Sequence, residues 1–194
     1  MIFNDVITGT TCSEVVHIKS NELLARLGKG IDLYSESMIK NIALFNDAVS
    51  YRYAYVKVPF KCVGDTCFFE NETVKSTSLS CVLKNCNEVV LLAVTAGITV
   101  DKLISKVSIQ NASDALCIDA ISSAAIESYI DYVNDIISEK YNLTKRFSPG
   151  YADFSLAFQS YLLKRVNAER IGISLSNNNF MIPMKSITAV IGIK

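Results

Sequence analysis

The stretch Lys145-Arg146-Phe147-Ser148-Pro149-Gly150-Tyr151 follows the longest helical pattern of the chain and precedes a shorter one. Pro149 fixes φ at the second position of a turn, and Gly150 accepts a positive φ at the third, so the stretch is predicted to end in a type II turn. Arg146 offers a planar guanidinium to a carboxylate, and Tyr151 offers a ring face to a base or a cation. Taken alone, the local sequence favours a simpler interpretation, a turn between helices with a solvated Arg146 and a half-buried Tyr151.

The pattern before this stretch, residues 111–140, is expected to form one long helix, because its apolar residues recur at helical spacing. Residues 120–125 are mostly small, which lets a neighbouring backbone approach closely. Acidic residues gather on the polar side of the helix, and most of them are expected to be solvated. Glu127 is a candidate site residue, because it adjoins the small residues.

Strand-like runs occupy much of the remaining chain. The continuous apolar run 89–95 is expected to be a central strand buried on both faces. The aromatic and β-branched run 51–60 is expected to end, or to lie at an edge, near Pro59. Further strands are expected over 15–18, 66–70, 171–175, 180–182 and 186–193, and helices over 21–27, 38–49, 78–83, 99–107 and 155–166. Residues 1–12 form a lead-in, and Gly28 and Gly30 stop the first helix.

This order of elements predicts a single α+β domain over residues 1–194, with a twisted, mostly antiparallel sheet flanked by helices. The strands and helices do not alternate strictly, and the sequence contains no G-x-G-x-x-G, so a dinucleotide-binding fold is not expected. The sequence also lacks a Walker-type glycine loop, G-x-S-x-G and H-E-x-x-H. The residues alone therefore predict an α+β domain with one candidate loop.

The composition excludes several classes of function. The 194 residues carry a formal net charge of zero, which argues against a general binder of nucleic acid or of anionic membranes. No apolar run is long enough to span a bilayer. Residues 1–10 lack the basic and apolar regions of a secretory signal, so a cytoplasmic location is expected.

The six cysteines include two C-x4-C pairs, Cys62 with Cys67 and Cys81 with Cys86. These four thiols could form a metal or redox module, although zinc sites usually have tighter spacing. Free and mostly buried thiols are the favoured interpretation, because disulfides are rare in cytosolic proteins. The single histidine, His17, lies in a strand-like run and is interpreted as structural.

The loop and its surroundings resemble the activation (reactivation) domain of cobalamin-dependent methionine synthase. The resemblance begins with Arg146-Phe147-Ser148-Pro149-Gly150-Tyr151-Ala152-Asp153, which is close to the family pattern R-x-S-P-G-Y-x-D. Two later segments, 171–175 and 181–193, are similar to the family's I-G-x-x-L-T and M-x-P-x-K-S-V-S-A-V-x-G-I. Residues 95–97 and 114–127 also fit. The resemblance covers residues 80–193, whereas residues 1–79 agree only in order and length.

This resemblance implies a protein that binds S-adenosylmethionine and supports reductive methylation of a cobalamin. The residues that match the family motif, and are thus implied to hold the ligand, are Arg146, Ser148, Pro149, Gly150 and Tyr151. In the family the arginine contacts the ligand carboxylate; Glu127 is a weaker candidate, for the sulfonium or amino group. No catalytic side chain is implied, because the cofactor carries the chemistry. The implied partners are a separate cobalamin-binding methyltransferase chain and a flavodoxin-like reductant.

Two departures from the family pattern leave an alternative open. The long enzymes continue beyond the last matched strand with tyrosines that contribute to the ligand site, so we expect that part to be missing or replaced after Lys194. The cobalamin motif D-x-H-x-x-G is also missing from this sequence, so any corrinoid is expected on another chain. The alternative is a non-catalytic interaction subunit of a corrinoid methyltransferase that no longer binds S-adenosylmethionine.

Overall fold

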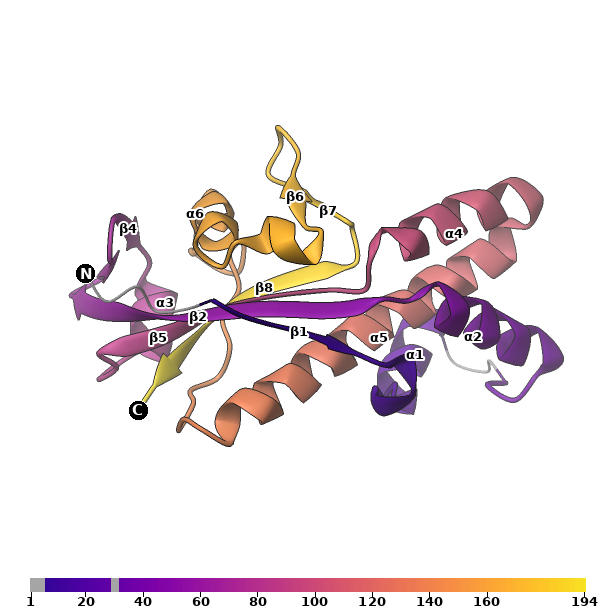
Figure 1. Cartoon of the computed structure of the whole chain (residues 1–194), viewed down its shortest axis with the longest axis horizontal. Coiled ribbons are helices and arrows are strands. Elements are labelled where there is room, and N and C mark those ends of the chain that lie inside the picture. The colour runs from indigo at the N-terminus through magenta and orange to yellow at the C-terminus, as the bar shows by residue number, and fades with distance from the viewer. Residues whose placement is uncertain (1–5, 29–31) are drawn as a thin grey trace.

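The computed structural model describes residues 6–28 and 32–194, which form an antiparallel sheet with helices on both faces (Figure 1). The strands are β1 (Ile7–Thr11), β2 (Tyr51–Val63), β3 (Thr66–Phe69), β4 (Glu72–Lys75), β5 (Glu88–Thr95), β6 (Ser174–Leu175), β7 (Met181–Ile182) and β8 (Ser186–Ile193). The helices are α1 (Ser20–Leu27), α2 (Glu36–Ala48), α3 (Thr77–Val82), α4 (Ile98–Gln110), α5 (Ala112–Ser138) and α6 (Phe158–Arg165), with 3-10 turns η1 (Ser13–Val15) and η2 (Ala168–Ile171). Gly30 and the first five residues of the predicted lead-in lie outside the described residues.

The long strand β2 organises the sheet. Strand β5 pairs with residues 52–59 of β2 along one edge, and β1 and β3 pair with 51–55 and 60–63 along the other. Strand β8 pairs with β5, and β4 with β3, which gives the order β4-β3-β2-β5-β8. Every pairing is antiparallel, which confirms the predicted α+β fold.

The sheet separates two hydrophobic cores, because side chains alternate along a strand. In β5, Val90, Leu92 and Val94 belong to the core under α5, α1 and α2. The intervening Val89, Leu91 and Ala93 belong to the core shared with α3 and α6. Figure 1 shows α5 on one side of the sheet and α6, with the β6–β7 hairpin, on the other. The predicted central strand, buried on both faces, is therefore confirmed.

The buried face of helix α5 combines small side chains with large apolar ones. Ala120, Ala124 and Ala125 are buried in this face. Farther along the helix, the fully buried ring of Tyr129 lies 4.5 Å from the ring of Tyr51 in β2. Asn111 caps the helix, because its side chain accepts hydrogen bonds from the amides of Ser113 and Asp114.

The chain that leaves α5 covers the outer edge of β8. The Thr144 amide donates to the Gly192 carbonyl at 2.9 Å, and Phe147 and Val190 exchange two backbone hydrogen bonds. Figure 1 shows this segment passing from the α5 side of the sheet to α6. The loop predicted from the sequence therefore lies at the edge of β8, between the two helical layers.

Two predicted strands, 15–18 and 171–175, are wrong. The predicted strand 15–18 is a 3-10 turn followed by coil, whereas the predicted lead-in contains β1, which forms only by pairing with β2. Most of the predicted strand 171–175 is not a strand, because Asn167 and Gly172 adopt positive φ and close the turn η2. Ser76 caps α3, and Gly97 precedes α4.

Pro59 lies within β2 and does not end it. The Phe60 amide donates toward β5, to the carbonyl of Asn87, so the nitrogen of Pro59 faces the opposite edge. On that edge, β1 pairs only as far as residue 55 and β3 begins at residue 60. The missing N–H of proline therefore removes no ladder hydrogen bond.

Candidate ligand-binding site

The predicted turn over 148–151 is present. The Tyr151 amide donates to the Ser148 carbonyl at 3.2 Å, and Gly150 has φ of +89°, as a type II turn requires. The Gly150 amide donates to the Phe154 carbonyl at 2.8 Å, so a second backbone contact closes the loop. Two loop amides and the carbonyls of Ser148 and Tyr151 are thus bonded within the loop, which leaves the carbonyls of Pro149 and Gly150 and the side chains to face a ligand.

Asp153 anchors this loop to the start of α3. Its carboxylate accepts hydrogen bonds from the Ser76 hydroxyl and the Thr77 amide, both at 2.7 Å, and from the Ser78 amide at 3.2 Å. The hydrogen bond from Ser76 and those from Ser78 and Thr77 lower the pKa of Asp153 to about 2. Asp153 is the last residue of the R-x-S-P-G-Y-x-D motif. This anchoring residue could therefore have been identified from the motif in the sequence.

The side chains of the loop differ sharply in exposure. Pro149 is buried and Ser148 half-buried, whereas Tyr151 is 71% exposed. The buried ring of Phe154 lies against Phe147, with 6.0 Å between the ring centroids, and fixes the base of the loop. The half-buried Tyr151 of the simpler interpretation is therefore wrong, because this ring stands in solvent on a rigid turn.

Arg146 points toward α5 and pairs with two of its carboxylates. Its Nη2 atom donates to Glu127 Oε2 at 3.0 Å, and its Nη1 atom donates to Asp131. Asp131 also pairs with Lys19, the residue that precedes α1. The solvated Arg146 of the simpler interpretation is therefore wrong. Glu127, predicted to lie beside a cationic group of the ligand, contacts the arginine of the loop.

These groups form an acidic cluster, which we define as Lys19, Glu22, Glu127, Asp131 and Arg146. Two cations and three carboxylates give it a formal net charge of −1. Within the described chain, the buried Oε2 atom of Glu22 has no hydrogen-bond partner. Burial raises the pKa of Asp131, but hydrogen bonds from Lys19 and Arg146 outweigh this effect and hold the pKa below its ordinary value. The carboxylate of Asp131 therefore remains charged at neutral pH.

Of the six residues predicted from the sequence, the structure brings Glu127 into contact with Arg146. Ser148, Pro149, Gly150 and Tyr151 form the turn that follows Arg146 in the same loop. The sequence analysis did not single out Asp131, although it lies four residues after Glu127 and so on the same helical face. Helical spacing could not identify Lys19 and Glu22, because they lie at α1, which contacts α5 only in the tertiary structure.

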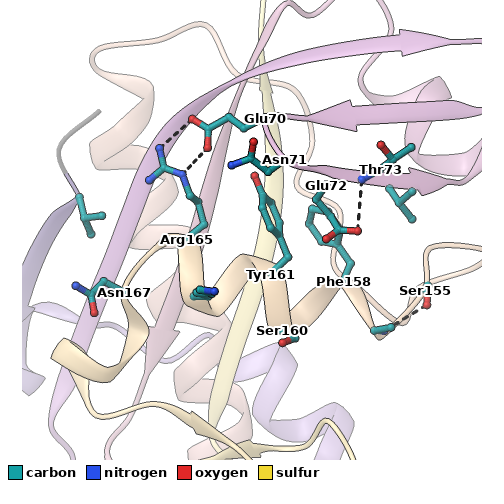
Figure 2. Close-up of a pocket in the computed structure, with 14 residues that line it drawn as sticks. Glu70, Asn71, Glu72, Thr73, Ser155, Phe158, Ser160, Tyr161, Arg165 and Asn167 are labelled. Carbon is teal, nitrogen blue, oxygen red and sulfur yellow. Dashed lines mark hydrogen bonds and ion pairs between the residues drawn. The ribbon is translucent and has the colours of Figure 1, made fainter. Parts of the chain in front are cut away.

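A separate cavity of about 1020 Å³ lies between α6 and the turn that joins β3 to β4 (Figure 2). Its walls include Glu70, Thr73, Phe158, Tyr161 and Arg165. Figure 2 shows the guanidinium of Arg165 against Glu70, with bonds of 2.6 and 3.0 Å. Of the described residues that line the cavity, none belongs to the six candidates, so the cavity and the loop are distinct features.

The cysteines do not form a four-thiol site. Cys62 and Cys67 lie together, whereas Cys81 is exposed and Cys86 buried. Among residues 6–28 and 32–194, no three His, Cys, Asp or Glu side chains are placed to hold a metal ion.

In the same part of the chain, no helix combines the length and apolar character needed to cross a membrane.

Comparison with known proteins supports the fold. No protein-family model matches the sequence, and no curated protein shows significant sequence similarity to it. Among solved structures, the chain is similar to the MetH reactivation domain bound to AdoHcy, with a TM-score of 0.67 and 14% identity. The similarity covers 98% of this chain and 79% of that one. The fold is that of the reactivation domain, which confirms the resemblance drawn from the sequence.

Proposed function

We propose that this protein binds S-adenosylmethionine between the Arg146–Tyr151 loop and the acidic cluster, and supports reductive methylation of a cobalamin held by a separate methyltransferase. The observation that carries the proposal is a single loop in this fold that holds Arg146 against the acidic cluster and, five residues later, exposes Tyr151 on a rigid turn. A domain of the same fold was crystallised with AdoHcy, the compound that S-adenosylmethionine becomes when it gives up its methyl group.

The charges of the site suit this ligand. S-adenosylmethionine carries a sulfonium, an ammonium and a carboxylate, a net charge of +1, and the acidic cluster carries −1. The partly exposed carboxylate of Glu22 is an acceptor for the ammonium group. AdoHcy lacks the sulfonium charge, so we expect the site to bind it less tightly than S-adenosylmethionine.

Arg146 can still contact the ligand carboxylate while it pairs with α5. A guanidinium has five N–H donors, and Glu127 and Asp131 each receive a bond from a different nitrogen. The side chain is 32% exposed, so part of it faces solvent. The protein carboxylates fix the plane of the guanidinium, which lowers the entropic cost of binding a second partner.

The turn supplies a place for the adenine. The ring of Tyr151 offers a stacking face, and contacts of this type contribute about 1–3 kcal/mol in nucleic-acid complexes. The carbonyls of Pro149 and Gly150 are acceptors for the exocyclic amino group of adenine, since those of Ser148 and Tyr151 already accept hydrogen bonds within the loop. An open site of this kind suits a methyl donor that must meet a large, flat corrinoid.

The remaining chemistry belongs to the partners. A flavodoxin-like reductant would supply one electron to the cobalamin of the partner, which would then accept the methyl group as its bond to the sulfur of S-adenosylmethionine breaks; AdoHcy would remain on this protein. The protein itself needs only to orient the ligand, so no general acid or base is required of its side chains.

Calorimetric titration of the purified protein with S-adenosylmethionine tests the proposal. We expect saturable binding, and weaker binding of AdoHcy. A methylation assay with a cobalamin-loaded methyltransferase, a flavodoxin and radiolabelled methyl donor then tests the second step. Absence of heat change, together with a stable complex between this protein and a corrinoid protein, would support the non-catalytic subunit instead.

A further inference from the structure

Cys62 in β2 and Cys67 in β3 face each other directly across the antiparallel pair, with their Sγ atoms 2.8 Å apart. The Phe60 amide points toward β5, and amide direction alternates along a strand, so Cys62 and Cys67 form a non-hydrogen-bonded pair with β3. The Cα atoms of such pairs are about 4.5 Å apart, within the range of about 4.4–6.8 Å that a disulfide spans. The backbone therefore already has a spacing that a bond between the two sulfurs requires.

The two thiols differ in access. Cys62 is half-buried, whereas Cys67 is buried and pairs on its other side with Val74 of β4. Burial, followed by the hydrogen bond with Cys62, raises the pKa of the Cys67 thiol. An external reagent thus meets Cys62 first, with Cys67 directly behind it.

We propose that Cys62 and Cys67 are a thiol-modification site that exchanges with low-molecular-weight disulfides such as oxidised glutathione. The thiolate of Cys62 attacks one sulfur of the small disulfide and releases one small thiol, which leaves a mixed disulfide on Cys62. Cys67 then loses its proton, attacks the Sγ atom of Cys62 and releases the second small thiol. The two cysteines lose two electrons and two protons, and the small disulfide gains them.

A disulfide between Cys62 and Cys67 would restrict one wall of the cavity in Figure 2. Cys67 is paired with Val74, and the β4 residues Glu72, Thr73 and Val74 line that cavity. Oxidation would tie β3 to β2 covalently and so hold β4, the wall of the cavity, in place. The loop at Arg146 lies outside this unit, so the inference does not depend on S-adenosylmethionine binding.

Mass spectrometry of the folded chain after incubation with oxidised glutathione tests this site. A Cys12→Ser/Cys81→Ser background removes the two exposed thiols. We expect the intact mass to fall by two hydrogen atoms with no glutathione retained on Cys62 or Cys67. Cleavage before Asp65, which lies between the two cysteines, should give fragments that separate only after reduction.

Two variants and one control make the outcome decisive. Cys67→Ser should keep a stable glutathione adduct on Cys62, and Cys62→Ser should react much more slowly than the parent. Disulfide formation should be at least about tenfold faster in the folded chain than in denaturant, because the fold holds the sulfurs in reach. A parent that stops at the glutathione adduct, stays reduced, or reacts equally fast when unfolded would overturn the proposal.

Discussion

Arg146 donates to Glu127 at 3.0 Å and also to Asp131, so one guanidinium joins the loop after α5 to two successive turns of that helix. Because Phe147 is bonded to Val190 of β8, the same short segment is fixed both to the helix and to the sheet edge. The position of the turn at Pro149 and Gly150 follows from these two attachments.

Removal of Arg146 should weaken the fold as well as the site. In Arg146→Ala the carboxylates of Glu127 and Asp131 lose a shared cation, and the free energy of unfolding should fall by about 1 kcal/mol, since the pairs are partly exposed. Urea denaturation measures this change. The control Arg170→Ala removes an exposed arginine and should stay within about 0.5 kcal/mol of the parent. Equal stability of the two variants would show that the contacts with α5 contribute nothing.

Tyr151→Ala should affect binding without affecting stability. The ring is 71% exposed, so its removal should change the free energy of unfolding by less than about 0.5 kcal/mol. Loss of the stacking face should weaken S-adenosylmethionine binding by about tenfold or more, measured by calorimetry. Tyr34→Ala removes another exposed tyrosine, remote from the loop in the sequence, and should leave affinity unchanged. Unchanged affinity in Tyr151→Ala would exclude this ring from the site.

Gly150→Ala should distort the turn. A Cβ at φ of +89° is strained, by about 1–2 kcal/mol, and this one would also lie 3.3 Å from Leu156 Cδ1. We expect lower stability and weaker ligand binding together. Gly64→Ala is a matched control, because φ is +63° there and a Cβ meets no described atom within 4 Å. That variant should lose stability through backbone strain but keep its affinity, and the reverse pattern would contradict the proposed site.

Asp153→Asn should lose a pH-dependent contribution to stability. The pKa of Asp153 is lowered from 3.8 to about 2, chiefly by the hydrogen bond from Ser76, so folding favours its charged form. That contribution is complete above the unfolded value of 3.8 and disappears as the pH falls toward 2. The stability difference between parent and variant should therefore be constant near neutral pH and shrink below about pH 4. Thermal denaturation across this range measures it, with the exposed Asp47→Asn as a control.

Local patterns in the sequence predicted elements whose own residues determine them. The apolar run of β5, the helical spacing of α5 and the Pro149-Gly150 turn are examples, and the structure contains all three. Strand β1 and the turn η2 were not predicted, because β1 depends on pairing with β2 and η2 depends on left-handed backbone at Asn167. Such long-range pairing leaves no periodic signal in a short segment.

For the candidate site too, the sequence predicted the local features but not the contacts between distant segments. The six candidate residues came from one contiguous motif and one helix, and the fold joins the two through the contact of Arg146 with Glu127. The sequence could not reveal that Glu127 would face Arg146, since their approach depends on how the chain returns along β8. Lys19 and Glu22 join the cluster only because α1 packs on α5, and that packing is set by tertiary structure.

The most direct test of the proposed site is a titration of isotopically labelled protein with S-adenosylmethionine, followed by amide NMR. We predict saturable shifts in residues 146–153, in the α5 residues 127–131 and around Lys19 and Glu22. The amides of residues 70–74 and 158–165, which include the cavity of Figure 2, should remain unchanged. No shifts at saturating ligand, or shifts confined to that cavity, would contradict the proposed site.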